Sequence, residues 1–159
     1  MAGGRSREDR RLRRSEVDAL LEAHARLGLD LVQLHGDAPI ARYAALGIPY
    51  VWVIRGTPDL DALPLVDPAP TRILLDAAVP GFGGVGVRTD WAWARAAVRR
   101  LAPAPVWLAG GITPENAAAA IAEVDPAGLD VASGSERAGA TRGEKDREKI
   151  AALIAACRR

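Results

Sequence analysis

Hydrophobic and polar positions follow two alternating patterns along the chain, and this alternation predicts strands and helices in turn. Short apolar runs bounded by Gly, Pro or charged residues are typical of strands that are buried on both faces of a parallel sheet. Five such runs occur, and they predict strands at 29–36, 50–54, 72–76, 105–109 and 128–132.

Apolar residues at helical spacing occupy the segments between these runs. The first predicted helix follows Ser15, a good N-cap, and ends at Gly28. Another has Thr113 as its N-cap and Pro114 at its first helical position. The complete set after Gly28 comprises helices at 40–46, 89–101, 114–124 and 145–158, with a helical or irregular segment at 60–65. Strands that alternate with helices indicate βαβ units and a parallel sheet.

The length of 159 residues and the 49% of hydrophobic residues indicate one domain with a real core. We expect residues 15–159 to form this domain and residues 1–14 to be a flexible leader. Six of these 14 residues are Arg, so a nucleic-acid-binding arm is the alternative interpretation. No aromatic residue lies among the charges, which favours a solvated helix start or a disordered leader.

Charge and cysteine content exclude several classes of protein. The net charge is only +1, whereas a whole-chain nucleic-acid binder is normally far more basic. The single Cys157 excludes an intrachain disulfide framework and a multi-cysteine zinc site, and it lies far from every predicted strand end. No apolar run approaches the ~20 residues that span a bilayer, and the N-terminus lacks the apolar core of a signal peptide. We therefore expect a cytoplasmic protein with no membrane or nucleic-acid partner.

The basic residues are strongly biased, with 19 Arg and two Lys. Genomic base composition is the simplest explanation. Arg is nevertheless the better bidentate ligand for phosphate, so each Arg near a glycine-rich loop needs individual attention.

Polar residues and glycines gather directly after the predicted strands. Because the carboxyl ends of parallel strands meet at one edge of a sheet, and active sites form there, we expect one site. Its candidate members are Gln33, His35, Gly36, Asp37, Asp76, the glycine-rich segment 81–86, Gly110, Gly111, Ser133 and Gly134.

Two neighbouring strands end in small residues that suit an anion. Gly110 and Gly111 precede one helix, and Ser133 and Gly134 follow the next strand. Backbone N–H groups at such turns bind anions, so the pair indicates one phosphate held between two loops. The alternative is that both are ordinary turns.

Two titratable residues at strand ends are candidates for proton transfer. Asp76 ends an apolar strand, where a carboxylate acts as a general acid or base. Its alternatives are a helix cap or an ion-pair partner of Arg72. His35 is suited to bind a substrate anion or to shuttle protons, or it is a hydrogen-bonded histidine at a strand end.

Several motifs, in order and at matching spacing from about residue 16, resemble the phosphoribosylanthranilate isomerase family. The matching segments are 29–37, 74–76 with 83–86 and 89–91, 108–116, 129–136 and 143–146. The resemblance implies a (β/α)8 TIM barrel and an enzyme of tryptophan biosynthesis. That enzyme converts N-(5-phosphoribosyl)anthranilate to 1-(2-carboxyphenylamino)-1-deoxyribulose 5-phosphate by an Amadori rearrangement, with no cofactor and no metal.

The same resemblance implies roles for individual residues. Asp76 matches the family's general acid, and Asp130 matches an aspartate for which we expect a structural or orienting role. The remaining implied residues bind the phosphosugar substrate, through Gln33, His35, Gly83, Gly84 and Gly86, or its phosphate, through Gly110, Gly111, Ser133 and Gly134.

The chain departs from the family in three ways. The family's base is a cysteine at the end of strand one, within Lys-Ile-Cys-Gly, and neither this motif nor the family's strand-two arginine is present. A barrel needs at least ~200 residues, so we expect an incomplete barrel of five parallel strands, the family's strands four to eight. The glycine-rich loop has Val85 and Val87 where the family has Thr and Lys, and Arg88 is the nearest replacement cation.

Five parallel strands without closure leave two open sheet edges, which invite pairing with another chain. We therefore expect self-association, aggregation, a partner fragment, or an incomplete reading of a longer gene. Two further functions stay open at this point. One is another phosphosugar enzyme of the same barrel class, of the epimerase or thiamine-phosphate synthase type. The other is a non-catalytic module that binds a phosphate ligand or a subunit.

Overall fold

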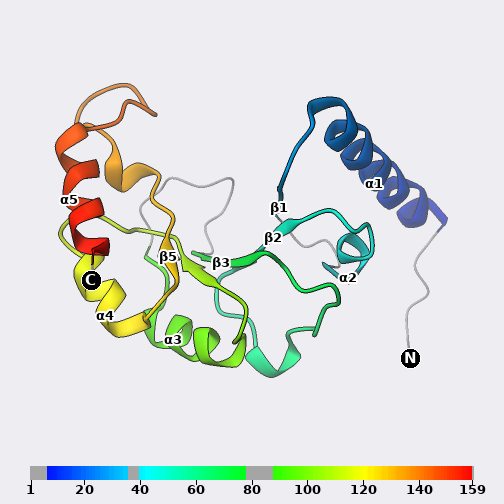
Figure 1. Cartoon of the computed structure of the whole chain (residues 1–159), viewed down its shortest axis with the longest axis horizontal. Helices are drawn as coiled ribbons and strands as arrows, with labels where there is room; N and C mark the ends of the chain where they lie inside the picture. Colours follow the sequence, from blue (N-terminus) through cyan, green and yellow to red (C-terminus); the bar gives the residue numbers. More distant parts are fainter. Residues whose placement is uncertain (1–6, 36–39, 78–87, 159) are drawn as a thin grey trace.

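The computed structural model describes residues 7–35, 40–77 and 88–158, with side chains from residue 16 onward. Its strands form one parallel sheet in the order β1-β2-β3-β4-β5, which confirms the predicted strand arrangement (Figure 1). The strands are β1 (Val32–Leu34), β2 (Tyr50–Arg55), β3 (Arg72–Asp76), β4 (Val106–Leu108) and β5 (Gly128–Leu129). The sheet is open, because in the described part of the chain β1 pairs only with β2 and β5 only with β4.

Helices gather at the two ends of this sheet. Figure 1 shows α3, α4 and α5 together at one end and α1 and α2 at the other. The α-helices are α1 (Arg7–Leu27), α2 (Ile40–Ala44), α3 (Trp91–Arg100), α4 (Ala117–Val124) and α5 (Arg147–Cys157). Two short 3-10 helices are η1 (Leu60–Ala62), which replaces the helical or irregular segment expected at 60–65, and η2 (Ser133–Ser135).

Two predicted helix starts are wrong. The first helix begins at Arg7 and not after Ser15, so residues 7–14 form the start of α1, which agrees with the helix-start interpretation of this segment. Arg, Leu and Glu are strong helix formers, and they outweigh the capping tendency of one Ser. The helix after β4 begins at Ala117 and not at Pro114. Residues 114–116 form a turn in front of it, in which the Thr113 carbonyl accepts from Asn116 N and also from Ala117 N.

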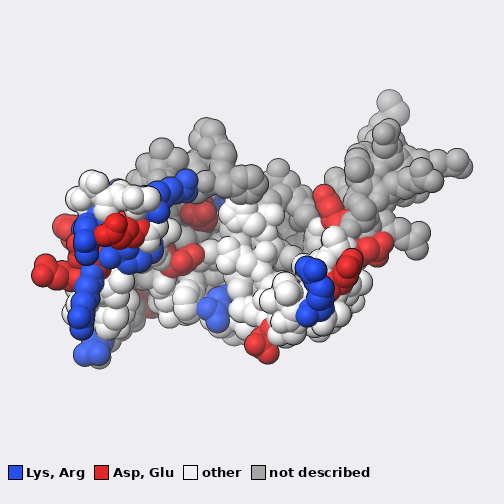
Figure 2. All heavy atoms as spheres, turned by 90° about the horizontal axis from the view of Figure 1, so that it is seen from above, with Lys and Arg blue, Asp and Glu red and all other residues white. Residues whose placement is uncertain are grey.

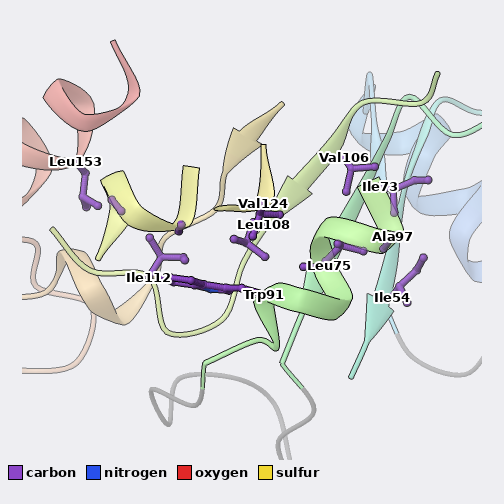
Figure 3. Close-up of a cluster of buried hydrophobic side chains, with 13 residues drawn as sticks. Ile54, Ile73, Leu75, Trp91, Ala97, Val106, Leu108, Ile112, Val124 and Leu153 are labelled. Atoms are coloured by element: carbon purple, nitrogen blue, oxygen red, sulfur yellow. The ribbon is translucent and has the colours of Figure 1, made fainter. Parts of the chain in front are cut away.

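The main core lies between the sheet and the C-terminal helices. Strand residues such as Ile73, Leu75 and Leu108 project into it, and Leu75 and Leu108 are fully buried. Figure 3 shows the Trp91 ring of α3 lying flat beside Ile112, with Leu153 of α5 at the far end of the same cluster. This packing fixes the loops after β4 and β5 relative to each other.

The opposite face of the sheet carries alternate strand residues, as the two-residue period of strands requires. Val51, Val53, Leu74 and Ala109 form a second apolar cluster there, with Trp107 packed against it. The guanidinium of Arg72 lies 4.4 Å from the centroid of the Trp107 ring. In β2 and β3 the same face ends at Arg55 and Asp76, which are register partners at the carboxyl ends of the strands.

Charge is distributed unevenly over the surface. Figure 2 shows basic and acidic side chains gathered at the end formed by the C-terminal helices and again toward the opposite end, with mainly uncharged residues between the two groups. Within the described ranges, no helix combines the length and the apolar character needed to cross a membrane.

Candidate active site at the carboxyl edge of the sheet

Asp76 and Asp130 lie in the same layer at the carboxyl edge of the sheet, on either side of β4. Asp76 ends β3 and is half-buried, and its Oδ1 accepts a hydrogen bond of 2.9 Å from Ala77 N. Asp130 follows β5, and its N–H donates to the Leu108 carbonyl at 2.9 Å. Loss of hydration and the negative charge of Asp76 together raise the pKa of Asp130. The two carboxyls therefore interact, although they lie 54 residues apart in the sequence.

The small side chain of Ala109 lies between these carboxyls in the sheet. Ala109 N donates to the Leu75 carbonyl at 2.8 Å, so Ala109 follows β4 in the same layer as Asp76. A larger residue there would fill the face of the sheet between the two strands that carry the aspartates. The small side chain of Ala109, in the segment Leu-Ala-Gly-Gly, thus leaves space for the carboxyls of Asp76 and Asp130.

Gly110 and Gly111 form a tight turn directly after β4. Their φ angles of +82° and +66° lie in the left-handed region that favours glycine. A β-carbon on Gly110 would lie 2.5 Å from Thr89 Oγ1, and Thr89 is itself buried and donates to the Ala109 carbonyl at 2.8 Å. The backbone here must be glycine for both reasons, steric and conformational.

Asn116 fixes the far side of this turn, and sequence reasoning did not single it out. Its Oδ1 accepts from Thr113 N and its Nδ2 donates to the Gly111 carbonyl, each at 2.9 Å. An amide side chain carries its donor and its acceptor on two separate atoms, whereas a Ser hydroxyl has both on one atom and a carboxylate only accepts. The signal that could have found it is its place in Gly-Gly-Ile-Thr-Pro-Glu-Asn, between the turn and the helix.

The second loop contacts the first. A β-carbon on Gly134 would overlap the carbonyl oxygen of Ile112, so the η2 backbone approaches the 110–113 turn as closely as two backbones can. The buried Ser135 supports η2, since its Oγ donates to the Ala132 carbonyl at 2.9 Å. The structure thus brings Gly110, Gly111, Ser133 and Gly134 together at one end of the sheet.

Gln33 and His35 lie on the other side of the site, on the edge strand and directly after it. Both are exposed, and they line a hollow of about 190 Å3 together with residues such as Tyr43 and Trp52. Strands β2 and β3 separate this hollow from the glycine loops. A ligand that contacts both groups must therefore extend across the carboxyl edge of the sheet.

The other candidate residues are not part of this arrangement. Five of them lie outside the described residues: Gly36, Asp37, Gly83, Gly84 and Gly86. Arg88 is exposed, and its guanidinium lies 4.4 Å from the Trp91 ring centroid. Arg72, an alternative partner for Asp76, is instead stacked on Trp107. Arg55, beside Asp76 in register, was missed by sequence reasoning, although it ends an apolar run as Asp76 does.

The described part of the chain contains no cluster of three or more His, Cys, Asp or Glu side chains suited to a metal ion. Backbone N–H groups at two contiguous glycine loops are suited to a phosphate, and the acidic pair is suited to proton transfer. An open parallel sheet with both features at its carboxyl edge is typical of the (β/α)-barrel class of proteins.

Comparison with known proteins gives the family. The family model of N-(5'-phosphoribosyl)anthranilate (PRA) isomerase matches residues 12–156, and the chain belongs to this family. The isomerase of Thiobacillus denitrificans is 44% identical over 141 residues, which is 87% of this chain and 64% of the relative. That of Roseiflexus sp. is 46% identical over 137 residues, or 82% of this chain and 60% of the relative.

Solved structures agree with this assignment. The isomerase of Thermus thermophilus superposes with a TM-score of 0.68 at 32% identity, covering 88% of this chain and 66% of that one. The Thermotoga maritima enzyme gives 0.66 at 30% identity, covering 87% and 66%. The sheet is thus of the TIM-barrel type, and the chain spans less than two thirds of the length of these curated relatives.

Proposed function

We propose that this chain takes part in the isomerisation of N-(5-phosphoribosyl)anthranilate to 1-(2-carboxyphenylamino)-1-deoxyribulose 5-phosphate in tryptophan biosynthesis. The observation that carries the proposal is that one edge of the sheet holds Asp76 and two glycine loops in mutual contact. An isomerase of 27% identity and TM-score 0.60, covering 86% of this chain and 63% of that one, binds reduced 1-(o-carboxyphenylamino)-1-deoxyribulose 5-phosphate. This compound carries a phosphate, an amine and an open sugar chain.

The phosphate anchors the substrate at the end of the site that β4 and β5 form. Turns with left-handed glycines direct consecutive N–H groups toward one point, which suits a tetrahedral dianion. In this proposal the residues that bind the phosphate are Gly110, Gly111, Ser133 and Gly134. The sugar then extends toward Asp76, with Gln33, His35, Gly83, Gly84 and Gly86 contacting the rest of the substrate.

Asp76 is the general acid of the first step. Its protonated carboxyl donates to the ribose ring oxygen, the C1–O bond breaks, and the anthranilate nitrogen lone pair forms the Schiff base. Asp130 orients this group through the interaction between the two carboxyls. A general base then removes the C2 proton, and the resulting enolamine tautomerises to the ketone. The reaction is a net isomerisation, so it requires no cofactor.

The residue that removes the C2 proton is the open part of the mechanism. The chain's one cysteine, Cys157, is exposed in the last turn of α5 and is not at the carboxyl edge of the sheet. Removal of a general base typically costs a factor of ~10²–10⁴ in rate. We propose that the base comes from barrel strands that pair with β1 and β5, in a longer form of this chain, in a partner fragment or in a second copy.

The test is turnover of phosphoribosylanthranilate, followed by the loss of its fluorescence and coupled to the next enzyme of the pathway. The 159-residue chain is assayed alone and after addition of a fragment with the first three βα units of a family barrel. Asp76→Asn is measured beside Asp18→Asn, which removes the same charge from the exposed face of α1. We expect turnover in the presence of the added fragment, and we expect Asp76→Asn to abolish it and Asp18→Asn to preserve it. Equal, measurable turnover by the two variants would refute the role of Asp76.

A second candidate function, a non-catalytic module that binds a phosphate ligand or a subunit, is supported by the absence of the Lys-Ile-Cys-Gly base motif from these 159 residues together with the open edges of the sheet. It predicts that ligand binding survives Asp76→Asn and that no turnover occurs with or without the added fragment. In either case we place the protein in the cytoplasm, with a phosphosugar ligand as its small-molecule partner and neither nucleic acid nor membrane as a partner.

A further inference from the structure

The chain contains only two lysines among 21 basic residues, and both contact the same short segment. Lys145 Nζ donates to the Ala132 carbonyl at 2.7 Å, and Lys149 Nζ donates to the Glu136 carbonyl at 2.8 Å. The two ammonium groups therefore bracket residues 132–136, the segment that carries Ser133 and Gly134.

Additional contacts join the same two stretches of chain. Asp146 N donates to the Ser135 carbonyl at 2.8 Å, and Glu136 forms an isolated antiparallel bridge with Lys145. Lys145 Nζ also lies 3.5 Å from Glu136 Oε1. Helix α5 begins directly after this stretch, because the Asp146 carboxylate accepts from Glu148 N and Lys149 N. The loop after β5 is thus held by the start of the last helix.

The Ala132 carbonyl accepts from Lys145 Nζ as well as from Ser135 N and Ser135 Oγ, and these contacts together fix the orientation of one peptide group. In a trans peptide the C=O and N–H bonds point in opposite directions. The peptide that joins residues 132 and 133 directs its oxygen at Lys145, so the Ser133 N–H points away from Lys145. The direction of this N–H is what decides whether η2 can bind an anion.

Lysine suits this task better than arginine. An ammonium group is a compact point charge on a flexible stem and can donate to a single carbonyl oxygen, whereas a guanidinium is a planar fork of five donors that matches two oxygens at once. Arg occupies 19 of the 21 basic positions, and the two lysines both donate to backbone carbonyls of this one segment.

We propose that Lys145 and Lys149 are positioning residues that hold residues 132–136 in the conformation that binds the substrate phosphate. This inference rests on the proposed function, because it assigns a role to the loop that forms half of the phosphate site. Neither lysine touches the phosphate in this proposal. Each acts through a backbone carbonyl, and the ligand class is a phosphate monoester.

The test uses the ¹⁵N-labelled chain and inorganic phosphate as the probe. The variants are Lys145→Met and Lys149→Met, and the control is Arg147→Met, which removes one positive charge from an exposed site between them. Phosphate is titrated while the Gly111 and Gly134 amide resonances are followed. Because a hydrogen bond from a charged group is stronger than one between neutral groups, we expect each lysine variant to weaken phosphate binding about tenfold or more, with Arg147→Met unchanged.

A second readout separates positioning from direct contact. We expect the amide resonances of residues 132–136 to move in the phosphate-free lysine variants, because the peptide planes lose their anchors. Weaker phosphate binding with unmoved resonances would mean direct contact and would overturn the proposal. Lys145→Arg keeps the charge and a donor, so it serves as a rescue variant if the Met variants unfold. Lys145→Arg should recover part of the wild-type affinity for phosphate. A folded Lys145→Arg chain that binds no phosphate would also overturn the proposal.

Failure of the inference and failure of the proposed function give different results. Wild-type affinity in both Met variants would reject the lysine role and leave the phosphate site intact. A wild-type chain whose Gly111 and Gly134 amides do not respond to phosphate would reject the phosphate site itself, and the role of the lysines with it.

Discussion

The carbonyl oxygen of Ile112 occupies the place where a β-carbon on Gly134 would lie. This contact joins the loop after β4 to the loop after β5 without any intervening side chain. The backbones of the two turns thereby form one continuous surface, which the proposed phosphate site requires.

Gly134→Ala tests this contact. The methyl group forces the two loops apart, and we expect a loss of about 1–3 kcal/mol in the free energy of unfolding, as for other overpacked sites. Phosphate binding should be lost as well. The control is Gly139→Ala, at φ +73° with open space around it, where backbone strain alone costs about 1 kcal/mol. Denaturant unfolding and phosphate titration of both variants give the comparison. If both variants bind phosphate equally well, the contact is not what forms the site.

The interaction between Asp76 and Asp130 predicts a shift that carbon NMR of the carboxyl groups can measure. We expect the pKa of Asp130 to lie above its ordinary value of 3.8, because lost hydration and the Asp76 charge both disfavour its ionised form. Asp76→Asn removes one of these causes, so the pKa of Asp130 should fall toward 3.8 in that variant. An Asp130 pKa that does not respond to Asp76→Asn would show that the carboxyls do not interact.

The same shift makes stability depend on pH. Folded Asp130 holds its proton more tightly than the unfolded chain does, so it contributes stability at pH values below 3.8. That contribution is lost as the pH rises through the raised value. Asp130→Asn lacks the effect. We therefore expect the stability of Asp130→Asn relative to the wild type to increase as the pH rises from 3.8 through the raised pKa of Asp130. Urea unfolding at several pH values measures this difference.

Asp90 is the N-cap of α3, where its Oδ1 accepts from Trp93 N at 3.0 Å. Asp90→Ala leaves this N–H without its partner, and we expect a loss of about 1 kcal/mol in the free energy of unfolding. Asp90→Asn keeps a capping oxygen and should stay close to the wild type. The urea midpoint is the measurement, and equal midpoints for Ala and Asn would contradict the capping role.

Leu75 lies at the centre of the core between the sheet and the C-terminal helices and has no exposed surface. Leu75→Ala should cost about 2–5 kcal/mol, because it removes buried methyl groups and leaves a cavity. Leu65 is 88% exposed, so Leu65→Ala should change stability by less than about 0.5 kcal/mol. Thermal or urea unfolding of the pair tests whether the core lies on this face of the sheet.

Sequence reasoning located the strands and the candidate residues that end them. A parallel strand buried on both faces must be apolar along its length, so the segment that ends at Asp76 is identifiable without any tertiary information. Gly110 was identifiable for a similar local reason, because a turn directly after a strand needs a residue that tolerates positive φ.

The local sequence did not determine where the helices begin or which hydrogen-bond partners their first residues have. The helix after β4 begins three residues later than Pro114 suggested, because Asn116 bonds to the 111–113 turn and not to the helix start. Residues 7–14 are helical, which is one of the two interpretations that the sequence left open for this segment.

Only the tertiary structure decided which distant residues meet. The sequence by itself determined the parallel α/β fold, the family motifs and the edge of the sheet where polar residues gather. It could not show that Gly134 touches Ile112, that Asp76 raises the pKa of Asp130, or that both lysines hold one loop. The physical reason is that these contacts join segments that only the packing of α3, α4 and α5 on the sheet brings together.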